Sequence, residues 1–382
     1  MIISLVKYYF PYPSFMSFKA FGLWVFFLFF GYIQAHAQVS APKYSNEFLN
    51  IGVGGRALGM GNVQAAIVHD ATAGFWNPAG LTQLTQRHNV ALMHSELFAG
   101  IVKNDFASYA MPLDTNSAFA VSLIRTGVDD IADTRNLVNE YGYINYDNIQ
   151  LFSVADYALI LSYARKSRLI NGLRLGGNAK IIYRNVGDFA NAYGFGLDFG
   201  AQLDRKKWHF GLMAKDITTT FNAWVHNPDK FRESAIITGD TLLIKNSVEI
   251  TLPRLIMGVA RDFRFSNKIT ALAAADLDFT FDGQRNVLLG SGLVSVDPHL
   301  GLEVNYGQLV YVRGGISNVQ QIKNFDQTQL WRAQPNFGVG IFTNGFRLDL
   351  ALSRLADTTP TNNFSENSRL SSVIVSLGYS FD

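Results

Sequence analysis

The chain has 382 residues, of which 16% are charged and 13% aromatic, with no cysteine and a formal net charge of +2. Soluble domains average about 25% charged residues, so this composition is more typical of a membrane β-protein than of a cytosolic enzyme. Without cysteine the chain has no disulfides, zinc–thiolate sites, thiol nucleophiles or lipobox for a lipid anchor. No basic cluster is present, so nucleic acid is not an expected partner.

Residues 1–37 are predicted to be a secretory signal peptide, and Met16 is the expected start of translation. A basic residue at Lys19 precedes an apolar stretch over 21–33 and a small-x-small cleavage site over 35–37. An uncleaved anchor is the alternative, but this stretch is short for a spanning helix. No later run has the length of a membrane helix, so an exported chain that spans a membrane must do so as a closed barrel.

A glycine-rich stretch lies within 38–86, which we expect to be a lead and a plug folded inside a barrel. Glycine lets the backbone turn tightly and approach a wall without an intervening Cβ. Asn77 and Pro78 are typical of an N-cap and a first helical residue, and Asp70 is a candidate cap for a shorter turn. The residues expected to characterise the plug are Gly52, Gly54, Arg56, Gly59, Gly61, Asn62, Asp70, Asn77, Pro78, Ala79 and Gly80.

Over 87–382 apolar and polar residues alternate with period two. Side chains on a strand point alternately to opposite faces, and in a membrane barrel the apolar face meets lipid while the polar face lines the lumen. We therefore predict an all-β fold, a transmembrane antiparallel barrel of about fourteen strands. The predicted strands are 87–97, 104–112, 117–126, 151–165, 173–186, 191–203, 208–217, 253–263, 268–281, 299–306, 309–317, 336–342, 346–355 and 371–381.

The connections between these strands alternate between short turns and longer loops. Outer-membrane barrels have short periplasmic turns and long extracellular loops, so both ends of the barrel are expected in the periplasm. Loops over 127–150 and 218–252 combine acidic and aromatic residues, which favours partner binding, with solvated lids as the alternative. The candidate partner-binding residues are Asp129, Asp130, Tyr141, Tyr143, Phe221 and Trp224.

The predicted polar faces carry charges of both signs. We expect a lumen charge network that pairs internally and holds the plug, with Arg56 as a partner for its acids. A conduction path is the alternative, but neutralised pairs suit a filled lumen better. The expected members are Arg174, Lys180, Arg184, Asp198, Lys215, Asp276, Asp278, Glu303 and Asp349.

No motif supports catalysis. The stretch 52–57 formally matches a dinucleotide fingerprint, but the βαβ context that this fingerprint requires is missing. His88, His94 and Glu96 share one face of the first predicted strand, where we expect them to line the lumen as ordinary polar residues. Neither a G-x-S-x-G elbow nor an H-E-x-x-H motif occurs. We therefore expect no enzyme activity, no catalytic residues, no cofactor and no metal.

Three pieces of the N-terminal region resemble the signature of the PorV/PorQ family. They are KYSNEFL at 43–49, GVGGRALGMG at 52–61 and DATAGFWNPAGL at 70–81. The last strand also resembles the assembly signal of outer-membrane barrels, although Asp382 follows its terminal aromatic residue. The Asn-Pro-Ala-Gly portion is shared more widely with FadL-like barrels.

The resemblance implies a fourteen-stranded, FadL-like barrel of the Bacteroidetes type in the outer membrane, with the N-terminal segment inside. It further implies a component of the type IX secretion system that binds or shuttles cargo to a cell-surface partner through its extracellular loops. The implied partners are outer-membrane lipids and the type IX translocon, sortase-like or cargo proteins. The alternative is a FadL-like channel for hydrophobic small molecules, which needs an apolar pocket beside the plug.

Overall fold

The computed structural model describes residues 45–139, 141–227, 246–323, 329–354 and 371–382. The predicted signal peptide, the start of the polar lead, residues 228–245 of the predicted loop over 218–252 and the connection over 355–370 lie outside the described residues. Within the described part of the chain, no helix is long and apolar enough to cross a membrane.

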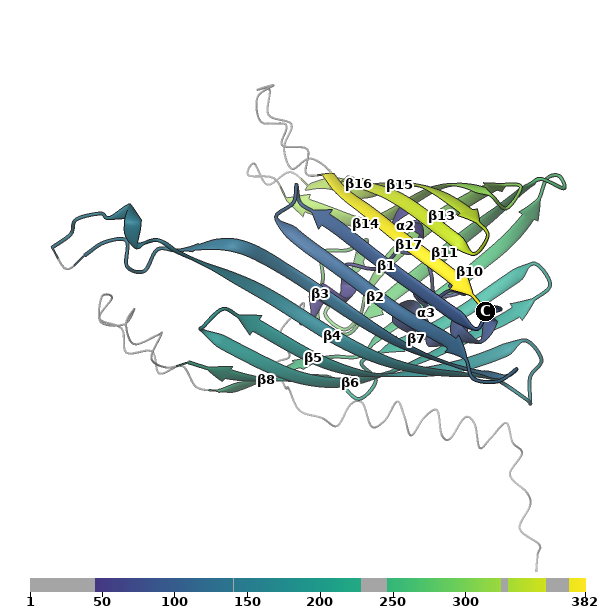
Figure 1. Cartoon of the computed structure of the whole chain (residues 1–382), viewed down its shortest axis with the longest axis horizontal. Coiled ribbons are helices and arrows are strands. Elements are labelled where there is room, and N and C mark those ends of the chain that lie inside the picture. Colours follow the sequence, from purple (N-terminus) through teal and green to yellow (C-terminus); the bar gives the residue numbers. More distant parts are fainter. Residues whose placement is uncertain (1–44, 140, 228–245, 324–328, 355–370) are drawn as a thin grey trace, which may run out of the picture. The chain divides into compact units, whose positions relative to one another are not determined.

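One antiparallel sheet contains every strand of the described chain (Figure 1). Fourteen strands follow one another around it, and the last of them, β17 (Ser371–Phe381), pairs with β1 (His88–Leu97). His88 lies opposite Phe381 at the start of this seam, which closes the sheet. The predicted fourteen-stranded barrel is therefore confirmed, and it leaves no open edge whose backbone groups would need partners in lipid.

The remaining strands are short additions to this ring. β8 (Thr220–His226) continues β7 (Trp208–Lys215), β9 (Ser247–Thr251) leads into β10 (Arg254–Arg264), and β12 (Leu289–Gly290) lies in a loop. The other strands are β2 (Val102–Pro112), β3 (Ser117–Asp133), β4 (Gln150–Lys166), β5 (Leu173–Val186), β6 (Ala190–Arg205), β11 (Ile269–Thr280), β13 (Ser295–Tyr306), β14 (Val310–Lys323), β15 (Gln329–Thr343) and β16 (Phe346–Arg354). The helices are η1 (Glu47–Asn50), α2 (Gly55–Gly59), α3 (Ala73–Trp76), η2 (Pro78–Gln83) and η3 (Tyr146–Asn148).

The outer face of the barrel is apolar and carries aromatic rings near the strand ends. Tyr183 lies between Tyr157 and Tyr193 on neighbouring strands, with ring centroids 6.1 and 5.2 Å apart. At the other rim the rings of Tyr379 and Phe381 stack at 5.2 Å. Aromatic residues at both rims are typical of membrane barrels, where they occupy the two interfaces.

Six short turns lie at one rim, together with the two ends of the barrel, while the short β1–β2 and β5–β6 connections lie at the other rim. Arg87 donates its backbone N–H to the Asp382 carboxylate there. The other rim carries the long connections, including the β3–β4 hairpin that projects beyond its neighbours in Figure 1. By the rule for outer-membrane barrels, the rim of short turns faces the periplasm.

The prediction that His94 and Glu96 of the first strand line the lumen is wrong, because the two faces of this strand are reversed. His94 and Glu96 point outward, where His94 Nδ1 lies 2.6 Å from Asp105 Oδ1, whereas Met93 and Ser95 are buried on the inner side. On the inner face of β1, Ala91 and Met93 belong to an apolar cluster that includes Val53 and Phe75. In β1, apolar side chains such as Met93 therefore point inward and charged side chains such as Glu96 point outward, the reverse of a strand that lines a water-filled lumen.

Several strands extend farther than predicted. Asp129 and Asp130 lie on β3, and Phe221 and Trp224 lie on β8, so assigning these four residues to loops is wrong. Antiparallel strands keep their backbone hydrogen bonds beyond the apolar band, and polar hairpins of this kind lack the alternation that marks a membrane strand. A register shift between Val128 and Ile131 further interrupts the pattern.

Candidate functional site

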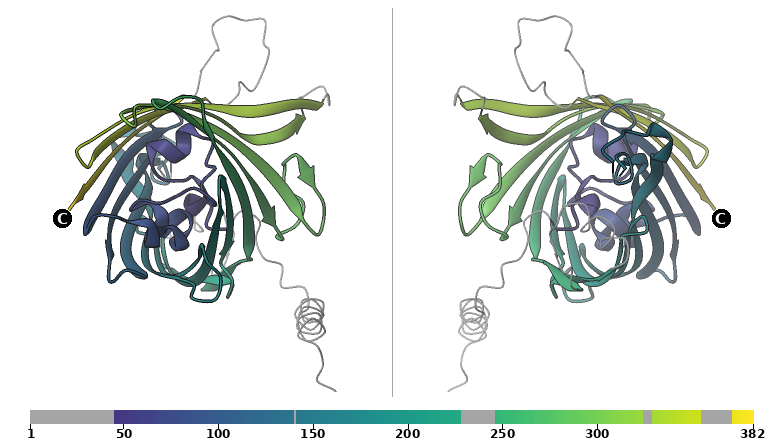
Figure 2. Two further views of the ribbon diagram at one scale, coloured as in Figure 1. Left: turned by 90° about the vertical axis from the view of Figure 1, so that its right-hand side faces the viewer. Right: turned by 90° about the vertical axis from the view of Figure 1, so that its left-hand side faces the viewer.

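Residues 45–84, here called the inner segment, lie against the inner faces of the strands (Figure 2). The backbone N–H of Gly55 donates to Ser376 Oγ at 2.8 Å. Asn178 Nδ2 donates to the Gly74 carbonyl at 2.9 Å, and Ser108 Oγ donates to the Ala71 carbonyl at 2.8 Å. These contacts come from well-separated strands of the ring, so the inner segment is held from several sides.

The helix start predicted at Asn77 and Pro78 is present, but the helix, η2, is a 3₁₀ helix. Asn77 Oδ1 accepts from the backbone N–H of Ala79 at 3.2 Å. Its Nδ2 donates to the carbonyls of Ala65 at 2.7 Å and Ala201 at 3.1 Å. One buried amide thus caps the helix and ties two parts of the inner segment to β6.

Asp70 does not cap α3, because the N-cap position is occupied by Thr72. Instead Asp70 Oδ1 accepts from the Thr72 backbone N–H and hydroxyl, and Oδ2 accepts from Arg347 at 2.8 Å. Burial disfavours the carboxylate, but Arg347, His69 and Thr72 outweigh it, so the pKa of Asp70 falls to about 2. The charged form of Asp70 therefore links the inner segment to β16.

Close backbone approach occurs where glycines of the wall meet the inner segment. A Cβ placed on Gly315 of β14 would lie 2.2 Å from the carbonyl carbon of Met60, closer than atoms can pack. Gly59 and Gly338 face each other in the same way, with a Cβ on Gly59 only 2.9 Å from the Gly338 Cα. The wall glycines are thus as necessary to this packing as those of the inner segment.

A buried ion-pair chain connects α2 to three strands. Arg56 Nε lies 2.9 Å from Glu303, and Arg313 bridges Glu303 and Asp349 at 2.6 Å each. Arg56 and Glu303 were singled out from the sequence, whereas Arg313 was missed. Arg313 shares the inward face of β14 with Gly315 and could have been found by extending the alternation pattern.

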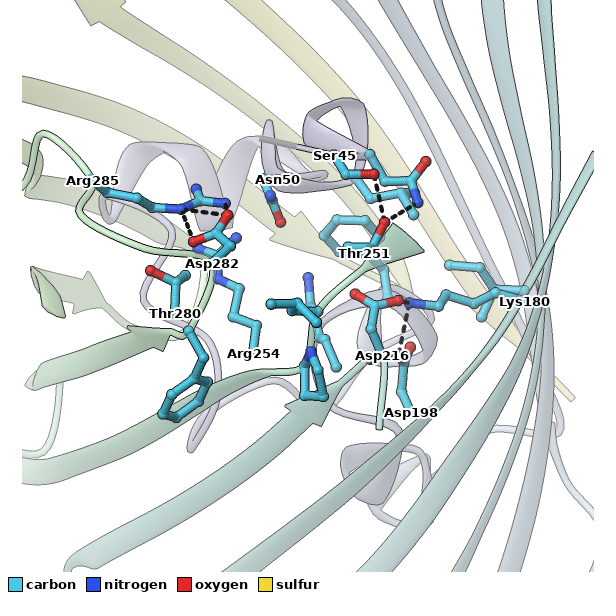
Figure 3. Close-up of a pocket in the computed structure, with 18 residues that line it drawn as sticks. Ser45, Asn50, Lys180, Asp198, Asp216, Thr251, Arg254, Thr280, Asp282 and Arg285 are labelled. Carbon is cyan, nitrogen blue, oxygen red and sulfur yellow. Dashed lines mark hydrogen bonds and ion pairs between the residues drawn. The ribbon is translucent and has the colours of Figure 1, made fainter. Parts of the chain in front are cut away.

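The other charges expected in one lumen network form separate groups. Lys180 lies 2.7 Å from Asp198 and 2.5 Å from Asp216 (Figure 3). The remaining pairs are Arg174 with Asp204, Arg184 with Asp156 and Glu249, and Arg254 with Asp278. Lys215 and Asp276 take part in no ion pair within the described residues. Asp216 and Arg254 were not predicted as members of the network, and each lies one residue from an end of its predicted strand.

Three cavities border the inner segment. The periplasmic cavity, about 510 Å³, lies beside β1, β16 and β17 and is lined by Arg56, Asp70 and Phe106, among others. The outer cavity (Figure 3), about 30 Å³, and the central cavity, about 40 Å³, lie on the other side and share Lys215 and Arg254. The periplasmic cavity shares no lining residue with the other two, so the inner segment separates them.

The tip of the β3–β4 hairpin carries exposed aromatic residues. The exposed fractions of Tyr141 and Tyr143 are 80% and 72%. Val138 and Ile144 form a bridge beneath them and are also exposed. Phe221 and Trp224, on β8, lie elsewhere on this rim, and the Trp224 indole donates to Glu249 at 2.9 Å. The structure therefore separates the predicted partner-binding residues into two places.

No family model matches the chain, and no curated protein sequence matches it. Solved structures do match. The toluene transporter TbuX of Ralstonia pickettii aligns with a TM-score of 0.53 at 12% identity, covering 87% of this chain and 99% of that one. The monoaromatic hydrocarbon channel CymD gives 0.53 at 13%, with 87% and 98% covered. A Pseudomonas aeruginosa FadL homologue gives 0.50 at 13%, with 86% and 98% covered.

At these identities the likeness concerns the fold. It extends over nearly the whole length of each matched chain, so the architecture is shared as a unit rather than through a few hairpins. A closed barrel with an apolar outer face satisfies its backbone groups internally, as a bilayer requires. The chain therefore has the fold of FadL-type outer-membrane channels, and its place is the outer membrane.

Proposed function

We propose that this chain is an outer-membrane channel for small, largely apolar molecules, with the inner segment as its gate. The observation that carries the proposal is the division of the lumen. A periplasmic cavity of about 510 Å³ lies on one side of the inner segment, and two small cavities lie on the other. A cavity of this size falls in the range that accommodates small ligands. The solved structures of the same fold include a toluene transporter and a monoaromatic hydrocarbon channel.

Passage then requires the inner segment to move relative to the wall. A disulfide between the position of Ser45, the first residue of the inner segment, and the wall would prevent that movement. Ser45 Oγ and Thr251 Oγ1 lie 2.7 Å apart, with Ser45 on the inner segment and Thr251 on β9 (Figure 3). Replacing both with cysteine puts two sulfur atoms close to bonding distance, and the chain has no other cysteine to compete.

The test is uptake of radiolabelled toluene by Gram-negative cells that carry the S45C/T251C variant in the outer membrane. We expect uptake to fall under oxidising conditions and to recover on reduction. The control is S108C/S122C, because these hydroxyl oxygens lie 2.9 Å apart but both belong to the wall. Equal uptake by the oxidised and reduced S45C/T251C protein would refute gating by the inner segment, and uptake no higher than in cells without the protein would refute the channel.

A second candidate function is the binding of secreted cargo or surface partners of a type IX secretion system. Two observations favour it: the resemblance over 43–81 to the PorV/PorQ signature, and the projecting β3–β4 hairpin with Tyr141 and Tyr143 at its tip. Rigid aromatic side chains on a projecting element supply contact area at low entropic cost. The proposed partners are the translocon, a sortase-like protein or cargo, together with outer-membrane lipids.

This candidate predicts that deleting the gene depletes secreted proteins from the cell surface and the medium. Replacing Tyr141 and Tyr143 with serine should reproduce the loss without affecting toluene uptake. An unchanged set of secreted proteins in the deletion strain would exclude it. The two candidates are therefore separated by which of the two assays responds.

A further inference from the structure

Lys215, the last residue of β7, is a buried lysine that has no ion-pair partner among the residues that the structure describes. Its exposed fraction is 7%, and it lines both the outer and the central cavity. Its Nζ lies 4.6 Å from the centroid of the Phe75 ring and 5.8 Å from that of Trp76. Within the described residues, this ammonium makes no hydrogen bond and no ion pair.

The neighbouring charges do not neutralise it. The acids that act on Lys215 are Asp198 and Asp216, and both bind Lys180 at 2.7 and 2.5 Å. Arg254, also close, adds a second positive charge. Asp198 and Asp216 therefore face two lysines, and both carboxylates contact Lys180.

The central cavity is also lined by the carboxylates Asp276 and Asp278, by His299 and by the amides of Asn50 and Asn62. Asp278 pairs with Arg254, so it offsets the guanidinium rather than the ammonium. Asp276 Oδ2 accepts from the backbone N–H groups of Gln64 and Ala65 at 2.8 and 3.0 Å, while Oδ1 has no partner among the described residues. Asp276 is not among the groups that act most on Lys215.

An aromatic face alone is a weak substitute for water around an ammonium. Cation–π attraction is smaller than the cost of taking such a charge out of water, so a buried ammonium usually has an ionic partner. The space beside Lys215 is small. The outer cavity has about 30 Å³ and the central one about 40 Å³, which is room for only a few water-sized groups.

We propose that Lys215 is the centre of a binding site for a small monovalent anion, of the size of chloride or of a single carboxylate group. The anion would sit between the Lys215 ammonium and Arg254, at the junction of the two cavities. The site does not depend on the proposed channel function.

The experiment uses the full-length protein purified in detergent. Chloride binding is followed by the excess line width of the chloride NMR signal, with sodium acetate and sodium gluconate as competitors. We expect excess broadening with the wild-type protein, competition by acetate but not by the bulkier gluconate, and loss of the effect in K215M. K215R should keep it, and K207M, at an exposed lysine, is the matched control.

A crystal grown in sodium bromide locates the ion, because bromine gives an anomalous signal. A peak beside Lys215 Nζ supports the site, and this measurement needs no variant, so a misfolded K215M does not weaken the test. Competition by acetate identifies carboxylate groups as ligands, and its absence restricts the site to halides. No broadening and no bromine peak in the wild-type protein, or undiminished broadening in folded K215M, would overturn the proposal.

Discussion

Glu303 connects the inner segment to the wall, so removing its charge should destabilise the whole protein. Its carboxylate accepts from Arg56 at 2.9 Å and from Arg313 at 2.6 Å, and all three side chains are buried. Glu303→Gln keeps the shape but leaves Arg56 without an acid in contact. Breaking a buried pair costs roughly 3–5 kcal/mol, and we expect about 3 kcal/mol because Arg313 keeps Asp349.

The assay is urea unfolding in phospholipid vesicles, followed by tryptophan fluorescence. The variant R56M/E303M should recover most of the loss, because replacing both members of a buried pair with apolar residues is often neutral. Asp129→Asn, which breaks the 3.0 Å pair with the more exposed Lys103, should cost far less, because water screens an exposed pair. An effect of Glu303→Gln as small as that of Asp129→Asn, or additive losses in the double variant, would refute this reasoning.

Two further predictions concern the attachment of the inner segment. Gly315→Ala should release it from β14 and expose it to added protease, because the new Cβ would overlap Met60, whereas Gly314→Ala, with open space around it, should not. The low pKa of Asp70, about 2 against an ordinary 3.8, means that its ionised form stabilises the folded state above about pH 4, a contribution lost as the pH falls towards 2. Its side chain is 30% exposed, so we expect about 1–2 kcal/mol in unfolding experiments, and Asp70→Asn should remove that pH dependence.

Local rules were sufficient for much of the barrel. All fourteen predicted strands are present, because period-two alternation and turn residues depend on neighbours in the sequence. The same holds for the helix start at Asn77 and Pro78, where a side chain caps a backbone group two residues ahead. The 3₁₀ geometry of that helix was not predictable, since the carbonyls of Ala65 and Ala201 that bind Asn77 come from distant parts of the chain.

Errors arose where a strand faces something other than lipid or water. In β1 the inner face packs on the inner segment, where Met93 accepts from the Gly54 N–H, and the alternation therefore carries the opposite meaning. In β3 the strand continues into solvent, so no apolar face marks its length as far as Asp133. Each failure has the same physical origin, because polarity reports the environment of a face and not the backbone conformation.

The sequence by itself determined the strand series, the membrane class of the fold and the glycine-rich segment that precedes the barrel. Only the tertiary structure decided which charges meet. Arg56 is 247 residues from Glu303, and no local pattern specifies a pair at that separation. The same is true of Lys215, which has no ion-pair partner among the described residues because Lys180 contacts both nearby acids. Partner choice inside a closed barrel follows from strand register and closure, which are properties of the whole ring.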